Sequence, residues 1–160
     1  MKVKDVFRSP VKSVTPMSSL DAVGRIMWES DSGAVPVVNA GGKVVGVLTD
    51  RDLAMSMAAK NRGASQILVR EITSGELFSC APEDDVVDAI QKMRSNRVRR
   101  LPVIDAEGQL LGMLSLKDLA LKANGTSGVS YEDVIVTMQA LCKVRADAIP
   151  QWPWVNAASR

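Results

Sequence analysis

The chain has 160 residues, with no histidine and only two cysteines, Cys80 and Cys142. Zinc sites are built mainly from histidine and closely spaced cysteine, and these two cysteines lie far apart in the sequence. We therefore expect neither a metal site nor a disulfide framework. The sequence also lacks the commonest general base, and no serine or cysteine lies in the motif of an activated nucleophile. We predict that the protein is not an enzyme and uses no catalytic cofactor.

Long apolar runs are missing as well. No stretch approaches the roughly 20 residues needed to cross a bilayer, and charged residues interrupt residues 1–8 before a signal-peptide core forms. The formal net charge of +2 does not by itself indicate a nucleic acid or a membrane as partner. With 46% hydrophobic and 24% charged residues, the composition is that of a soluble globular protein. We expect a cytoplasmic protein without a membrane partner.

What the sequence does contain is an internal repeat. A shift of 66 positions carries residues 35–39, which read VPVVN, onto residues 101–105, which read LPVID. The same shift pairs Gly46 with Gly112, Thr49 with Ser115 and Asp52 with Asp118. A repeat of this length indicates one supersecondary unit that occurs twice, so we expect two copies packed about a pseudo-twofold axis.

Each copy has the pattern strand, helix, strand, strand, helix. An apolar stretch ends at a proline and is followed by apolar residues with helical spacing, from Leu20 in the first copy and from Val86 in the second. Two apolar strands then flank a short turn that contains glycine, which predicts a β-hairpin. The predicted strands are 11–14, 35–38 and 44–48 in the first copy, and 77–80, 101–104 and 110–114 in the second. The fold class is therefore α+β, with two β-α-β-β-α repeats packed through their sheets.

We place the first repeat at residues 1–62, the second at 63–124, and a C-terminal helix and tail at 125–160. Ser130 and Asp133 predict the start of this last helix, and we expect it to cover its own domain, with a partner contact as the alternative. Its predicted apolar face consists of Val134, Ile135, Met138, Leu141 and Cys142. Trp152 and Trp154 in the proline-punctuated tail strengthen the partner interpretation.

The second helix of each copy begins with a hydroxyl residue and carries an aspartate three positions later. Thr49 with Asp52, and Ser115 with Asp118, fit a capping box, which needs no ligand. The same helix start could instead bind a phosphate, with the carboxylate accepting hydrogen bonds from a ribose diol. A basic residue inside both motifs favours an anion, although the motif alone leaves both interpretations open.

These residues give the chain a resemblance to a known family. The signatures apolar-Pro-Val-apolar-Asn/Asp and Gly-apolar-apolar-Thr/Ser-x-x-Asp-Leu each occur twice at matching spacing. The pair resembles a tandem of cystathionine β-synthase (CBS) domains, called a Bateman module, over roughly residues 1–124. The resemblance implies a regulatory module that binds adenine nucleotides in two clefts between the repeats.

The resemblance also implies roles for individual residues. Asp52 and Asp118 would hold the ribose hydroxyls. Phosphate would meet Thr49, Arg51, Ser115 and Lys117. The base pocket would be lined by Val14, Thr15, Cys80 and Ala81, and the ligand flanked by Ala34, Val35, Arg100 and Leu101.

The two copies differ just before the Pro-Val pair. The first has Gly33 and Ala34 where the second has Arg99 and Arg100, so we expect unequal sites. These arginines end a basic stretch formed by Lys92, Arg94, Arg97, Arg99 and Arg100. The stretch fits a solvated helix face, phosphate contacts for a nucleotide, or a nucleic-acid patch.

The leading hypothesis is a non-enzymatic sensor that binds AMP, ADP or ATP and signals to a regulated partner, which the sequence does not identify. S-adenosylmethionine, NADH or a cyclic dinucleotide would be other ligands for such a site. The resemblance further implies a homodimer. The alternatives are a constitutive dimerisation or scaffold protein without a ligand, and a CBS protein that binds nucleic acid.

Overall fold

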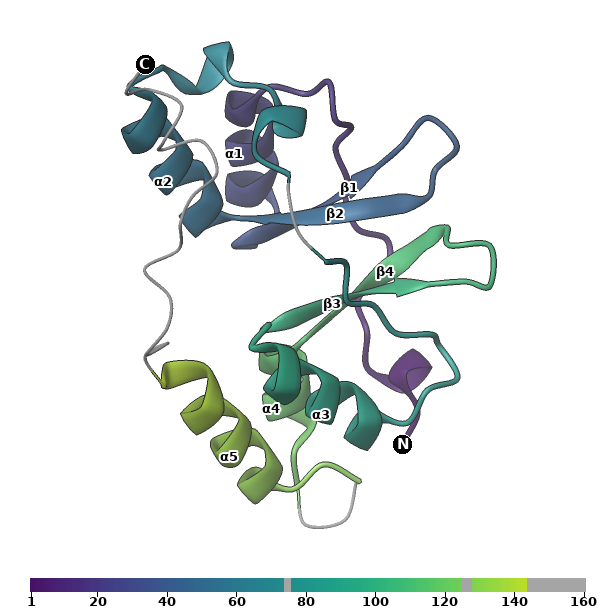
Figure 1. The fold of residues 1–160 in the computed structure, drawn as a ribbon. Coiled ribbons are helices and arrows are strands. Elements are labelled where there is room, and N and C mark those ends of the chain that lie inside the picture. The colour runs from purple at the N-terminus through teal and green to yellow at the C-terminus, as the bar shows by residue number, and fades with distance from the viewer. Residues whose placement is uncertain (74–75, 125–127, 144–160) are drawn as a thin grey trace. The chain divides into compact units, whose positions relative to one another are not determined.

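The structure, a computed structural model, describes residues 1–73, 76–124 and 128–143. The predicted tail with Trp152 and Trp154 lies outside these residues. The described helices and strands are α1 (Leu20–Glu29), β1 (Ala34–Val38), β2 (Val44–Thr49), α2 (Asp50–Lys60), α3 (Val86–Asn96), β3 (Arg100–Ile104), β4 (Leu110–Ser115), α4 (Leu116–Lys122) and α5 (Tyr131–Cys142) (Figure 1). Short 3-10 helices lie at Val3–Asp5, Ala64–Gln66 and Val69–Glu71. The predicted α+β class is confirmed.

The described chain divides into two compact units. The second-repeat unit contains Leu77–Lys143 together with Met1–Val11 and the turn residues Gly41–Val44. The first-repeat unit contains Lys12–Ala40 and Val45–Glu76. The N-terminal segment therefore packs with the second repeat, not with the first. The domain boundaries at 62 and 124 and the pseudo-twofold packing stay predictions.

Equivalent backbone hydrogen bonds hold the short segment before each repeat. The N–H of Val3 donates to the carbonyl oxygen of Asp84 at 3.0 Å, and that of Val69 donates to Ser18 at 2.9 Å. These pairs are related by the sequence repeat. Each repeat is thus completed by the segment that precedes the other one.

In the first-repeat unit, β1 and β2 form a two-stranded sheet. The expected strand at 11–14 is reduced to one bridging residue, Val14, which pairs in parallel with Val37. The same correction holds in the other unit, where Cys80 alone pairs with Val103. A proline two residues after each bridge cannot donate a ladder hydrogen bond, which explains why the pairing stops. The core of this unit includes Leu20, Val23, Val35, Leu48 and Ile67.

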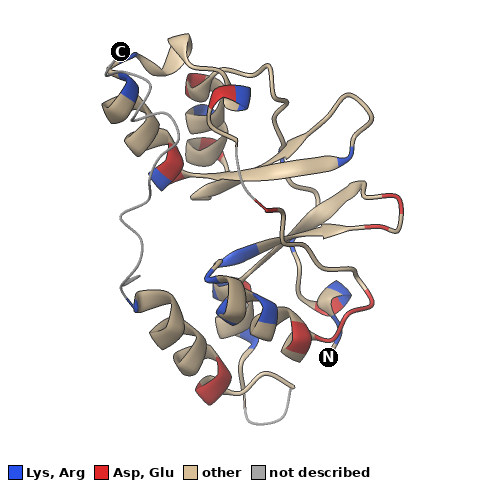
Figure 2. Cartoon of the chain, in the orientation of Figure 1, with Lys and Arg blue, Asp and Glu red and all other residues tan. Residues whose placement is uncertain are grey.

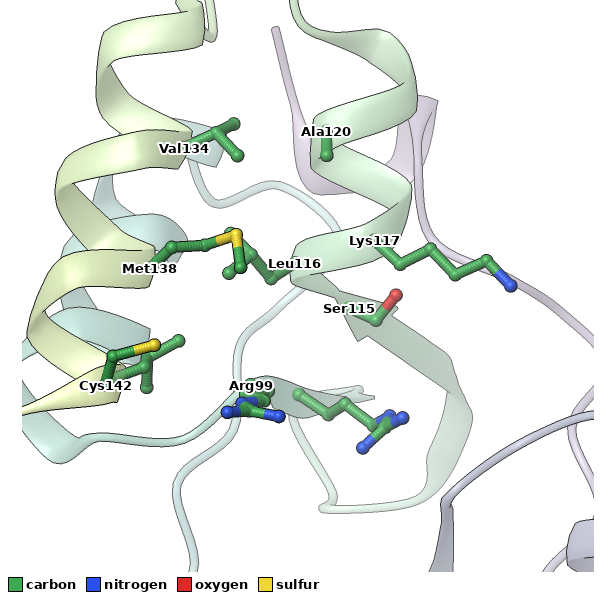
Figure 3. A pocket seen from close by; sticks show the side chains of 10 residues that line it. Arg99, Ser115, Leu116, Lys117, Ala120, Val134, Met138 and Cys142 are labelled. Atoms are coloured by element: carbon green, nitrogen blue, oxygen red, sulfur yellow. The ribbon is translucent and has the colours of Figure 1, made fainter.

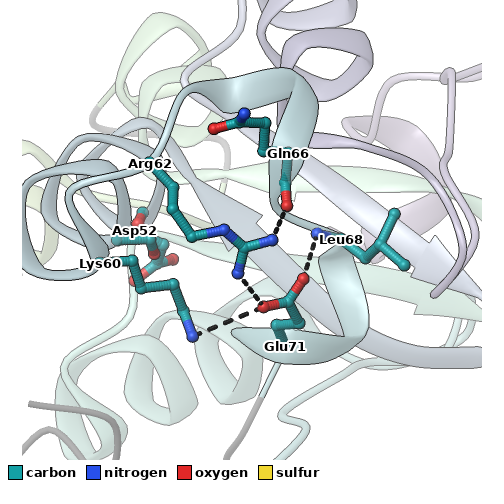
Figure 4. A network of polar contacts seen from close by, with 7 residues as sticks. Asp52, Lys60, Arg62, Gln66, Leu68 and Glu71 are labelled. Carbon is teal, nitrogen blue, oxygen red and sulfur yellow. Dashed lines mark hydrogen bonds and ion pairs between the residues drawn. The ribbon is translucent and has the colours of Figure 1, made fainter. Parts of the chain in front are cut away.

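A polar network joins the end of α2 to the 3-10 helix Val69–Glu71 (Figure 4). Glu71 accepts hydrogen bonds from Arg62 Nη1 at 2.8 Å and from the N–H of Leu68 at 2.9 Å, and Lys60 Nζ lies 3.6 Å away. Chiefly because the Leu68 N–H stabilises the carboxylate, with help from the Arg62 and Lys60 cations, the pKa of Glu71 is lowered. The network fixes the segment that leads from the first repeat into the second.

In the second-repeat unit, β3 and β4 pair antiparallel, with Arg100 opposite Ser115 and Val103 opposite Gly112. Arg8 extends this sheet because its N–H and carbonyl both bond to Met113, at 2.9 and 3.0 Å. Gly112 permits this close approach, since a Cβ there would collide with the Arg8 carbonyl oxygen and the Phe7 ring. The core includes Met93, Leu101, Val103, Leu114 and Leu119.

Helix α5 contacts α3 and α4 of the same unit, so the prediction that this helix covers its own domain is confirmed. Its face differs in part from the prediction. Val134 and Thr137 are buried, whereas Ile135 is 55% and Met138 48% exposed. The reason is that Arg94 of α3 reaches across to Thr137, which turns a polar residue inward.

No helix within the described ranges is long and apolar enough to span a bilayer.

Candidate functional site

The predicted hydroxyl and aspartate motifs lie at the starts of α2 and α4, and both form the capping box. Thr49 Oγ1 accepts a hydrogen bond from Asp52 N at 3.3 Å, and Asp52 Oδ2 accepts one from Thr49 N at 2.8 Å. In α4, Ser115 Oγ accepts from Asp118 N at 3.1 Å, and Asp118 Oδ2 accepts from Ser115 N at 3.0 Å. The capping interpretation is therefore confirmed at both positions, and these side chains have a structural role without any ligand.

The residues just before the Pro-Val pair meet the same helix starts. The carbonyl oxygen of Gly33 accepts from Asp50 N at 3.2 Å, and that of Arg99 accepts from Leu116 N at 2.9 Å. Residues that lie 17 positions apart in the sequence are thereby brought together in each unit, by the hairpin between them. The family resemblance implied that these residues flank one ligand, and the structure brings them to the same helix start.

In the second-repeat unit this meeting point opens into a cavity of about 290 Å³ (Figure 3). Its polar side carries Arg99, Arg100, Ser115 and Lys117, which are four of the predicted site residues. Its apolar side is formed by two helices: α4 supplies Leu116 and Ala120, and α5 supplies Val134, Met138, Leu141 and Cys142. In Figure 3, Val134 and Met138 point from α5 toward α4, while Arg99 and Ser115 lie below them at the ends of the strands. The cavity can thus hold a small molecule with an anionic and an apolar part.

The basic stretch runs along α3 and into the start of β3, which both carry blue segments in Figure 2, and its residues have different uses. Lys92 Nζ donates to the carbonyl oxygen of Ser79 at 2.7 Å, and Arg94 donates to Thr137. Arg97 ends α3 in the left-handed conformation, with φ 53°. Arg99 and Arg100 line the cavity. This division favours anion contacts for Arg99 and Arg100, whereas Lys92 and Arg94 make structural contacts, with the Ser79 carbonyl and with α5.

Asp118 has an additional partner that the sequence motif does not reveal. Its Oδ1 accepts a hydrogen bond from Arg8 Nε at 2.6 Å, and only 7% of the Asp118 side chain is exposed. In the first-repeat unit, the hydrogen bonds described for the Asp52 side chain all reach Oδ2. The two aspartates that occupy equivalent sequence positions are therefore in different electrostatic surroundings.

The other predicted residues do not line the cavity. Cys80 is buried, and burial raises the pKa of its thiol to about 12, so it remains protonated and unreactive. The backbone N–H of Cys80 and that of Val14 donate to the prolines of β3 and β1. Val14, Ala34, Val35 and Leu101 are buried, Ala81 and Asp52 are partly buried, and Thr15 and Arg51 are exposed.

Two contributions to the site were missed from the sequence. Helix α5 lies outside the repeat, so the motifs gave no reason to place Met138 or Leu141 beside Ser115. Arg8 is distant from Asp118 in sequence. The repeat aligns Arg8 with Ser74, which is uncharged, so the comparison of the two copies gave no sign that Arg8 pairs with an aspartate. Leu116 directly follows the capping hydroxyl and could have been identified as the next residue of the helix start.

The duplicated α+β unit, with the same helix start in both copies, defines a tandem-repeat module. The sequence matches the CBS domain family over residues 3–59 and 69–124. The chain belongs to this family.

Known relatives agree with this assignment. The CBS domain-containing protein YhcV of Bacillus subtilis (strain 168) is 35% identical over 134 residues, which cover 82% of this chain and 94% of YhcV. The solved structure of CBSX2 in complex with AMP is 25% identical, with a TM-score of 0.63 over 76% of this chain and 94% of that one. The CBS domain pair of MJ0100, solved with 5′-methylthioadenosine and S-adenosyl-L-methionine, has a TM-score of 0.70 at 21% identity, over 76% of this chain and 94% of that one.

Proposed function

We propose that this protein is a non-enzymatic regulatory module that binds an adenine nucleotide and passes the binding event to a partner protein. The observation that carries the proposal is the convergence of Arg99, Arg100, Ser115 and Lys117 on one cavity with an apolar wall. Guanidinium and ammonium groups bind phosphate, and an apolar wall accepts the face of a purine. The AMP complex of CBSX2, a similar protein, supports the same ligand class.

The size of the cavity selects among the candidate ligands. Small-molecule sites enclose roughly 300 to 1,000 Å³, and this cavity of about 290 Å³ is at the lower end. A mononucleotide such as AMP fits that range better than NADH or a cyclic dinucleotide. S-adenosylmethionine carries a sulfonium cation and no phosphate, so the two arginines disfavour it.

A thermal-shift panel tests the proposal. The protein is first freed of bound ligand by unfolding and refolding, then heated with AMP, ADP, ATP, S-adenosylmethionine, NADH or cyclic dinucleotides. A ligand at about 100 times its Kd raises the melting temperature of a chain of this size by roughly 5 to 11 °C. We expect this rise with AMP, and a smaller rise in the double variant Arg99→Ala with Arg100→Ala, which removes the phosphate contacts of the cavity in the second-repeat unit. Arg70→Ala is the matched control, since Arg70 is exposed and lies in the other unit. A flat panel from folded protein would refute the proposal.

The observed capping boxes favour one second candidate, a constitutive dimerisation or scaffold protein in which Thr49, Asp52, Ser115 and Asp118 only begin helices. The double variant Asp52→Ala with Asp118→Ala separates the two functions. Either protein loses some stability, because both capping boxes form without a ligand. A sensor loses in addition the nucleotide site at Asp52, whereas a scaffold binds no nucleotide before or after the substitutions. The homodimer expected from the resemblance is checked by sedimentation, where a monomer alone would contradict it.

A further inference from the structure

The two predicted ribose-binding aspartates, Asp52 and Asp118, differ in one respect: Asp118 forms an ion pair with Arg8. An ionised carboxylate has about four acceptor positions on its two oxygens. Asp118 uses Oδ2 for the N–H and hydroxyl of Ser115, and Oδ1 for Arg8 Nε at 2.6 Å. With 7% of its side chain exposed, Asp118 offers almost no surface to a further ligand. A ribose diol needs two acceptor positions and would have to displace Arg8.

Arg8 is held in this position by its backbone. Its N–H and carbonyl both bond to Met113 of β4, and the neighbouring Ser9 hydroxyl donates to the carbonyl oxygen of Leu111 at 2.8 Å. Gly112 leaves the space that this segment occupies. The backbone of Arg8 is therefore fixed beside β4, and its guanidinium, on a side chain that is 55% exposed, reaches the buried Asp118 carboxylate from there.

The sequence of the first repeat has no arginine at the position equivalent to Arg8, which is Ser74 and carries no charge. The hydrogen bonds described for the Asp52 side chain all go to Oδ2, none of them goes to Oδ1, and Asp52 is partly exposed. Asp52 can accept hydrogen bonds from a ribose diol while it keeps its capping bonds.

From this difference we propose that Arg8 is a specificity-determining residue that makes the second site insensitive to the ribose diol. This inference rests on the proposed nucleotide binding. The second site then recognises its ligand by the phosphate contacts of Arg99 and Arg100 and by the apolar wall of α5. Its ligand class is an anion with an apolar group, with or without a sugar diol. The first site, through Asp52, requires the diol.

Isothermal titration with AMP and with 2′,3′-dideoxyadenosine monophosphate tests the inference. In the variant Asp52→Ala, only the second site binds a nucleotide. We expect AMP and the dideoxy nucleotide to bind this variant with Kd values within threefold of each other. Adding Arg8→Ser frees Asp118, and AMP then binds at least tenfold more tightly than the dideoxy compound. Lys4→Ala is the matched control, because it removes another cation of the same segment, one that pairs with the exposed Glu83, and it leaves the ratio unchanged.

Two results overturn the inference. One is a tenfold preference for AMP in Asp52→Ala with Arg8 intact, and the other is an unchanged ratio after Arg8→Ser. If Asp52→Ala fails to fold, the wild-type protein gives the answer: it binds two AMP but one dideoxy nucleotide per chain, and equal stoichiometry contradicts the inference. Absence of saturable binding of either nucleotide to folded wild-type protein contradicts the proposed function itself, and the inference with it.

Discussion

Arg94 of α3 donates hydrogen bonds from Nε and Nη2 to the hydroxyl oxygen of Thr137 on α5, each at 3.2 Å. Thr137 is fully buried, and Arg94 Nη2 also reaches the carbonyl oxygen of Asp133 at 3.4 Å. This contact fixes α5 on α3. Because α5 supplies the apolar wall of the cavity, a pair of residues outside the predicted site determines the shape of that site.

Replacing Thr137 by valine removes the hydroxyl acceptor and keeps the shape of the side chain. The Arg94 guanidinium then loses its main partner at a buried position, and we expect the free energy of unfolding to fall by about 1 to 3 kcal/mol. Urea unfolding measures this loss, and hydrogen exchange should show faster opening of α5. Gln139→Ala on the exposed face of the same helix is the control, with a change within about 0.5 kcal/mol. Equal stability of the two variants would contradict the role of the contact.

Replacing Met138 by alanine removes part of the apolar side of the cavity. Met138 is 48% exposed, so the fold loses little, but a purine packed on the wall loses apolar contact. We expect AMP to bind about 3- to 10-fold more weakly, with a melting temperature close to that of the wild type. Ile135→Ala is the matched control on α5, since Ile135 is exposed and does not line the cavity. A similar loss of affinity in both variants would argue against an apolar wall.

Replacing Glu71 by glutamine removes the charge that pairs with Arg62 and Lys60, while the amide oxygen can still accept from the Leu68 N–H. We expect a loss of about 1 kcal/mol at pH 7, between the values for an exposed ion pair and for a charged hydrogen bond. The pKa of Glu71 is lower in the folded state than the unfolded value of about 4.3, so its contribution is present above that pH. It is lost as the pH falls through the folded pKa.

The difference in unfolding free energy between wild type and Glu71→Gln should therefore shrink as the pH is lowered from 7 to 3. Glu83→Gln serves as the control, because Glu83 forms only an exposed pair with Lys4. A difference that is independent of pH would show that the carboxylate charge of Glu71 is not what stabilises the segment.

Two glycines should respond in opposite directions to alanine. Gly112→Ala places a Cβ against the backbone of Arg8 and the ring of Phe7, and we expect a loss of about 1 to 3 kcal/mol. Gly24 lies inside α1, where a Cβ would meet only Leu53 Cδ2 at ordinary contact distance, 3.8 Å. Alanine there should stabilise the helix by about 0.5 to 1 kcal/mol. Thermal unfolding of both variants checks the contrast, and a stable Gly112→Ala protein would refute the close docking of residues 7–9.

The sequence repeat predicted most helices and the hairpins because apolar periodicity and turn residues are local signals. The capping hydroxyls at Thr49, Ser115 and Ser130 gave the helix starts for the same reason. The packing of Val3 against the second repeat could not be read from the pattern, since nothing local distinguishes it from packing against its own repeat. The short first strands were overestimated because apolar content alone does not reveal how many residues find a pairing partner.

The candidate site was predicted only in part. Residues inside the repeated motifs were brought together as expected, since a hairpin fixes their distance. Met138 and Arg8 come from segments without a repeat signature, and only the tertiary structure places them. The inward position of Thr137 was missed because a polar residue on an apolar helix face is predicted to be exposed unless its partner, here Arg94, is known.

A crystal structure of the refolded protein with AMP at a saturating concentration, fixed beforehand by titration, tests the central claim most directly. The account predicts one AMP with its phosphate on Arg99 and Arg100, and a second with its phosphate at the start of α2 beside Thr49 and its ribose hydroxyls on Asp52. AMP bound away from both helix starts, or both sites empty under these conditions, would contradict it.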